Sequence, residues 1–136
     1  MAAQGCAVPL SRRTIGRVVA AVRGGERRHL GTVSVTFLSA PHMRSLNRRS
    51  LGADSVTDVI AFGLSHRGRR VADIYVCPTR ARSAARAARV PEREELVRVL
   101  VHGLLHCLGY DHPGGPTRTA SRMWRRQERY VERLVP

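Results

Sequence analysis

Apolar side chains recur along the chain with two different periods, which separate its helical segments from its strands. A repeat of three to four positions predicts amphipathic helices, and strict alternation with polar residues predicts half-buried strands. By these criteria helices are expected at residues 11–23, 41–48, 78–89, from 91 to near Gly109 and 119–134, and strands at 31–38, 56–62 and 71–76. The polar segments 51–55 and 63–70 are expected to form a loop and a basic turn. This order predicts an α+β fold in which a small mixed sheet packs against several helices.

The helix that begins near Pro91 is apolar around much of its circumference, which predicts a central buried helix. Pro91 suits the start of a helix, and the acidic residues that follow suit its positive end. Its apolar positions are Leu96, Val97, Leu100, Val101, Leu104 and Leu105. The chain has 136 residues and contains no linker, repeat or low-complexity tract, so residues 1–136 are expected to form a single domain.

Several features of the sequence favour a cytoplasmic protein. Residues 1–9 lack the basic region and apolar core of a secretory signal, and no apolar stretch is long enough to span a bilayer. Cys6, Cys77 and Cys107 are odd in number and widely spaced, which is typical of reduced thiols. We therefore expect a cytoplasmic location and no membrane partner.

Three of the six histidines fall within eleven residues at the end of the predicted central helix. His102 and His106 are four positions apart, so they share one helix face. Gly109 can end the helix in a left-handed conformation, after which His112 can approach the same point. Three imidazoles that converge in this way predict a catalytic zinc site with one zinc ion per chain and an open fourth position. Nickel or another divalent ion is chemically possible.

Two other interpretations of the histidines fit the sequence less well. Three unrelated histidines would not explain why ligand number, helical pitch and the turn glycine all agree. Metzincin peptidases have the same histidine spacing, but a glutamate follows their first histidine as the general base. Here Gly103 occupies that position and cannot accept a proton. The spacing therefore supports metal binding and argues against the peptidase mechanism.

The net charge of +14 indicates a polyanionic partner. All 24 basic residues are arginine, whose planar fork of donors pairs well with phosphate. GC-rich codons would explain the absence of lysine, but not the excess of positive charge. RNA or DNA is therefore the expected partner.

Several motifs resemble those of the YbeY-type endoribonucleases, which mature ribosomal RNA. The segment 102–112 resembles the family's H-G-x-L-H-x-x-G-Y-D-H signature, and 57–62 resembles its T-D-V-L-S-F strand. The segment 72–76 is similar to the family's G-D-I-x-I strand. Supporting matches are Leu46, Asn47, Met123 and Glu128, so the resemblance runs from the first predicted strand to the end of the chain.

The resemblance implies a metal-dependent hydrolase that cuts single-stranded rRNA, with roles in 16S rRNA 3′-end processing and ribosome quality control. It also implies that His102, His106 and His112 are the zinc ligands and that the small ribosomal subunit is a partner. The family's Y-R-G-x-D motif is changed here, because Leu51 replaces its arginine. Arg48 or Arg49 is a candidate to supply the missing charge to the substrate.

The expected chemistry is hydrolysis of an RNA phosphodiester by a zinc-activated water, with arginines holding the RNA backbone. The sequence indicates no general base. Asp111 is a candidate for that role or for capping the turn. Asp58 and Asp73 are candidates for hydrogen bonding to a ligand histidine. The alternatives are a non-catalytic, zinc-containing, ribosome-associated RNA-binding factor and a metzincin-like zinc peptidase.

Overall fold

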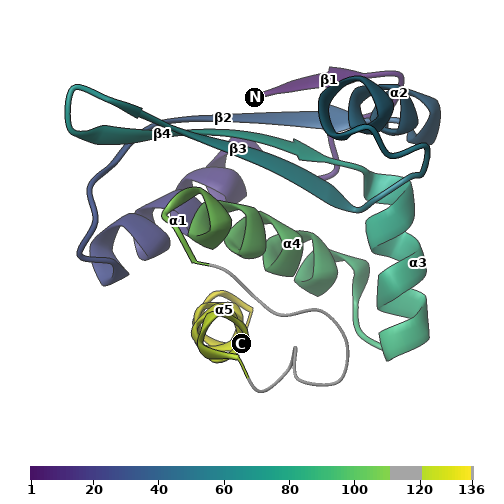
Figure 1. Ribbon diagram of the computed structural model, residues 1–136. Coiled ribbons are helices and arrows are strands. Elements are labelled where there is room, and N and C mark those ends of the chain that lie inside the picture. The colour runs from purple at the N-terminus through teal and green to yellow at the C-terminus, as the bar shows by residue number, and fades with distance from the viewer. Residues whose placement is uncertain (111–120, 136) are drawn as a thin grey trace.

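A computed structural model describes residues 1–110 and 121–135, and it confirms the predicted α+β fold (Figure 1). Within these residues, five helices surround one four-stranded sheet. In chain order the elements are β1 (Ala2–Gln4), α1 (Arg12–Gly25), β2 (Leu30–Leu38), α2 (Ala40–Leu51), β3 (Val59–His66), β4 (Arg69–Val76), α3 (Pro78–Ala88), α4 (Glu92–Cys107) and α5 (Arg122–Leu134).

The sheet is mixed and has the strand order β1-β2-β4-β3. β2 pairs in parallel with both β1 and β4, whereas β3 and β4 form an antiparallel hairpin. β1 is absent from the prediction because three residues are too short to show alternation. Its place is set by pairing with β2, in which Ala3 lies opposite Phe37.

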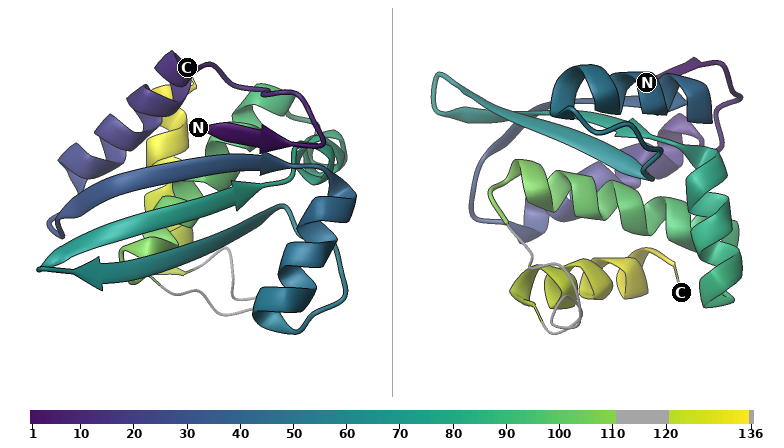
Figure 2. Two further views of the ribbon diagram at one scale, coloured as in Figure 1. Left: turned by 90° about the horizontal axis from the view of Figure 1, so that it is seen from above. Right: turned by 45° about the vertical axis from the view of Figure 1, so that its right-hand side comes forward.

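The β3–β4 hairpin corrects two predicted boundaries. β3 begins at Val59, later than the strand expected at 56–62. The turn expected at 63–70 shortens to Arg67 and Gly68, because the residues on either side of these two pair as β3 and β4. Both turn residues have positive φ, as a two-residue hairpin turn of type I′ requires. The hairpin tip projects beyond the helices (Figures 1 and 2), so polar residues lie in paired strands there. Polarity at the tip therefore reflects solvent exposure and was wrongly interpreted as a turn.

The helices form layers on the two faces of the sheet, with α4 as the central one. α1, α4 and α5 lie on one face with α5 outermost, α3 stands at one end, and α2 covers the opposite face (Figures 1 and 2). The predicted central helix is confirmed, since its six apolar positions are each at most 3% exposed. A smaller core on the α2 face contains Leu38, Met43, Ile60 and Cys77. In the part of the chain that the structure describes, no helix is both long and apolar enough to cross a membrane.

Candidate metal centre and adjoining pocket

The last two turns of α4 carry His102 and His106. His102 is partly buried and His106 is exposed, and they lie one helical turn apart on the rigid central helix. His112, the third predicted ligand, lies outside the described residues. Residues 1–110 and 121–135 contain no group of three His, Cys, Asp or Glu side chains that could hold a metal ion. The three-histidine ligand set therefore stays a prediction.

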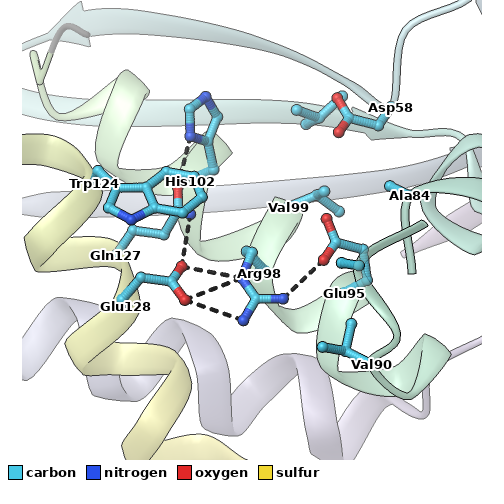
Figure 3. Close-up of a pocket in the computed structure, with 12 residues that line it drawn as sticks. Asp58, Ala84, Val90, Glu95, Arg98, Val99, His102, Trp124, Gln127 and Glu128 are labelled. Carbon is cyan, nitrogen blue, oxygen red and sulfur yellow. Dashed lines mark hydrogen bonds and ion pairs between the residues drawn. The ribbon is translucent and has the colours of Figure 1, made fainter. Parts of the chain in front are cut away.

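A buried glutamine fixes the imidazole of His102 (Figure 3). His102 Nδ1 lies 2.7 Å from Oε1 of Gln127, which is 2% exposed. Because an amide oxygen only accepts hydrogen bonds, Nδ1 is the protonated nitrogen. The amide itself is oriented by Glu128, whose carboxylate accepts from Gln127 Nε2 at 3.0 Å. Nε2 of His102 is therefore the nitrogen through which this side chain would ligate a metal.

Glu128 is held in turn by an ion-pair network around Arg98. Arg98 Nε and Nη2 donate to the Glu128 carboxylate at 3.0 Å, and Nη1 donates to Glu95 at 2.7 Å. Burial opposes the charge on Arg98, but hydrogen bonds to Glu128, Glu95 and Glu94 raise its pKa above the ordinary value. The network thus links the position of His102 on α4 to two consecutive residues of α5.

Gly103 faces the sheet, away from solvent. A Cβ atom at this position would lie 3.2 Å from Ile74 Cγ2 and 3.4 Å from Val59 Cγ2. A glutamate here would therefore enter the core between α4 and the sheet. Cys107, beside His106, is also buried, and burial raises the pKa of its thiol to about 11. It packs as a small apolar residue.

A buried carboxylate anchors the chain just after α4. Glu26 is 4% exposed in its side chain; it accepts from Tyr110 Oη at 2.7 Å, from Arg126 Nε at 2.9 Å and from the Tyr130 hydroxyl. Burial tends to raise the pKa of Glu26, but these hydrogen bonds prevail and lower it. The predicted turn glycine is confirmed, because Gly109 has a φ of 97°. Tyr110, two residues before His112, is thus tied to α1 and α5.

Four arginines gather around a cavity of about 550 Å³ at this same end of α4. Two of them are tied to the protein: Arg28 Nη1 donates to the Leu108 carbonyl at 2.5 Å, and Arg126 Nε donates to Glu26 at 2.9 Å. A third, Arg122, lies over the Tyr110 ring at 5.9 Å from its centroid. Together with Arg27 they outnumber the single carboxylate, Glu26, that lines the cavity among the described residues. We call these four residues the basic cluster.

The remaining candidate residues lie in different places. Arg48 and Arg49 end α2 on the opposite face of the sheet; Arg48 lies 3.7 Å from Asp54, and Arg49 donates to the Ser45 carbonyl. Their role in substrate binding stays a prediction. Leu51, where the family has arginine, is 60% exposed.

The two candidate aspartates also differ. Asp58 lines the pocket beside His102. Asp73 accepts a hydrogen bond from Tyr75 at 2.9 Å. Asp111 lies outside the described residues. Sequence reasoning missed Gln127, although one signal was present: a polar residue within the inward-facing stripe that Met123, Tyr130 and Val131 form on α5.

Comparison with known proteins gives a consistent assignment. Residues 10–135 match the family model described as endoribonuclease YbeY. The chain is 32% identical to the endoribonuclease YbeY of Chlorobaculum tepidum over 120 residues, which are 88% of this chain and 86% of that protein. It is 34% identical to the endoribonuclease YbeY of Thermotoga maritima, covering 75% of this chain and 67% of that protein.

A solved structure agrees with this assignment. The solution structure of TM1509 from Thermotoga maritima has a TM-score of 0.67 and 28% identity, and the match covers 98% of this chain and 87% of that one. The resemblance seen in the sequence is confirmed, and the expected class of enzyme agrees with the name that the relatives carry. The chain belongs to the endoribonuclease YbeY family.

Proposed function

We propose that this protein is a metal-dependent endoribonuclease that cuts single-stranded rRNA, with one zinc ion held by His102, His106 and His112. The observation that carries the proposal is the fixed imidazole of His102, whose Nδ1 is bound by Gln127 one turn away from an exposed His106. A ligand histidine typically donates its second ring N–H to such a partner, so His102 is suited to be one ligand of a metal.

The donor set suits zinc, which favours imidazole nitrogen and, with three protein ligands, keeps one position open. When bound, the metal would supply Lewis-acid chemistry and lower the pKa of a water molecule to about 7. The described residues contribute orientation. Gln127 fixes the ring of His102, and the hydrogen bond to Glu26 fixes Tyr110, two residues before His112 in the sequence.

RNA fits the charge of the protein. The basic cluster adjoins the histidine-bearing end of α4, so its guanidinium groups can bind phosphates of a strand that passes the histidines. We propose 16S rRNA 3′-end processing and ribosome quality control as the role, the small ribosomal subunit as the partner and the cytoplasm as the location. These finer assignments rest on the resemblance of the motifs.

The position of Gly103 disfavours a zinc peptidase. The glutamate that such an enzyme needs would point into Ile74 and Val59 instead of toward a substrate. One observation favours a second candidate, a zinc-containing RNA-binding factor without catalysis: the exposed Leu51 offers no charge where the family carries arginine.

The test is cleavage of a single-stranded RNA that carries the 16S rRNA 3′ end, together with metal analysis. Wild-type protein should cut the RNA, lose activity to a chelator and regain it with zinc. His102→Ala and His106→Ala should lose both metal and cleavage, whereas His42→Ala, on the exposed face of α2, should retain both. Binding of RNA by zinc-loaded protein without any cleavage would support the non-catalytic factor instead.

A further inference from the structure

A second cavity, of about 380 Å³, lies beside His102 and is distinct from the basic cluster (Figure 3). It is bounded by α3, α4, α5 and the start of β3, and His102 is part of its wall. Its volume falls within the range of roughly 300–1,000 Å³ that is typical of small-molecule pockets. A group held here would therefore sit next to the proposed metal centre.

One side of this cavity is suited to a flat, apolar ring. Trp124 lines it in the first turn of α5, where its backbone N–H donates to the N-cap Ser121 Oγ at 3.0 Å. The rest of the apolar lining consists of aliphatic side chains, namely Val59, Ala84, Ala88, Val90 and Val99. Proteins that bind single-stranded RNA commonly place unstacked bases against such aromatic surfaces.

The charges of the cavity exclude a phosphate as its occupant. Among its described lining residues are three carboxylates and one guanidinium. The guanidinium, that of Arg98, already donates to Glu128 at 3.0 Å and to Glu95 at 2.7 Å. The remaining carboxylate, that of Asp58, makes the lining negative, so the cavity would repel phosphate and attract hydrogen-bond donors. The basic cluster is the better site for phosphates.

Asp58 is placed to accept hydrogen bonds from such donors. Its backbone carbonyl accepts from Cys77 N–H at 2.8 Å, which fixes the residue where the chain enters β3. In Figure 3 its carboxylate lies across the pocket from Trp124. The Thr57 hydroxyl donates to Asp58 Oδ1 over a long distance of 3.5 Å. A carboxylate that only accepts selects bases with amino groups, and guanine matches both oxygens because its N1–H and N2–H₂ are adjacent.

We propose that this cavity is a nucleobase subsite for the RNA, in which an amino-bearing base, with guanine the best fit, packs against Trp124 and donates to Asp58. The subsite rests on the proposed endoribonuclease function and adds a base preference next to the cleaved bond. Residues that touch neither phosphate nor metal would thereby decide which RNA sequences are cut fastest.

The test uses the fact that Trp124 is the single tryptophan of the chain. Full-length, zinc-loaded protein is titrated with GMP and UMP while tryptophan fluorescence is followed. Neither nucleotide contains a phosphodiester, so binding is measured without cleavage. GMP should quench the fluorescence at concentrations at which UMP has little effect. Asp58→Asn should weaken GMP binding about 10-fold. The same substitution at Asp54, which lies outside the cavity and pairs with Arg44, should leave binding unchanged.

Equal quenching by GMP and UMP, no quenching at saturating GMP, or equal losses in Asp58→Asn and Asp54→Asn would overturn the subsite. Thermal unfolding of both variants verifies that each is folded. A protein that cuts RNA without quenching by GMP would refute the subsite alone. A protein that binds GMP as predicted but never cuts RNA would refute the nuclease and keep the subsite.

Discussion

Replacing Gly103 tests the packing of the histidine-bearing helix on the sheet. A methyl group at this position would lie 3.2 Å from Ile74 Cγ2 and 3.4 Å from Val59 Cγ2, so the neighbours must shift by a few tenths of an ångström. Such overpacking costs about 1–3 kcal/mol, and alanine regains about 1 kcal/mol of helix propensity over glycine. Gly103→Ala should therefore lower the free energy of unfolding by roughly 0–2 kcal/mol.

Gly103→Glu should be far more damaging, although it recreates the H-E-x-x-H pattern of zinc peptidases. The same position must then take a carboxylate, and burial of an unpaired ion costs several kcal/mol more. Total stabilities are only about 5–15 kcal/mol, so much of the stability would be lost. With about 2.1 cal/mol/K of unfolding entropy per residue, 1 kcal/mol corresponds to about 3–4 °C at this chain length. The melting temperature should fall by more than about 10 °C.

Thermal unfolding followed by circular dichroism measures both variants, each with and without zinc. The expected order is wild type, then Gly103→Ala within about 7 °C, then Gly103→Glu well below both. If Gly103→Glu melted within about 2 °C of the wild type, its side chain would have to reach solvent, and the orientation of α4 described above would be wrong.

Three further predictions concern other parts of the site. Gln127→Leu removes the acceptor for His102 Nδ1 and should weaken zinc binding about 10–100-fold in a chelator competition. An affinity equal to that of the wild type would exclude the positioning role. Because the pKa of Glu26 is lowered, its charge stabilises the fold above the ordinary carboxyl pKa, and this contribution is lost as the pH falls through the lowered value. The difference in urea midpoint between wild type and Glu26→Gln should therefore be large at neutral pH and shrink in acid. A difference that stays constant with pH would contradict this role of Glu26. Replacing Arg27 and Arg122 by alanine should make RNA binding less dependent on salt. Measured by fluorescence anisotropy, the slope of log affinity against log salt concentration should become shallower by about 0.7 for each lost phosphate contact. An unchanged slope would show that RNA does not bind to the basic cluster.

Local periodicity explains why the central part of the fold was predictable from the sequence. The apolar positions of α4 and the four-residue spacing of His102 and His106 depend on helical pitch alone. The conformation of Gly109 was likewise predictable, because a left-handed residue after a helix strongly favours glycine. Each of these features involves residues close together in the chain.

Features that depend on distant residues were beyond the sequence. Gln127 is 25 residues from His102, and nothing in the pattern of α5 says which residue of α4 it meets. Glu26 reaches Tyr110 across 84 residues and was not singled out. β1 forms a strand because it pairs with β2. The tip of the β3–β4 hairpin lies outside the core, so its residues do not alternate between apolar and polar. Sequence patterns reveal burial, whereas the site is completed by tertiary hydrogen bonds.

Coordination of a metal by three imidazoles is the central requirement of the proposed activity, and zinc X-ray absorption on the purified protein tests it most directly. The expected spectrum has one zinc per chain with three nitrogen ligands at about 2.0–2.1 Å and an oxygen ligand in the open position. His112→Ala should lose one nitrogen ligand or the metal itself. A sulfur ligand at about 2.3 Å, or an unchanged spectrum in His102→Ala, would contradict the metal centre.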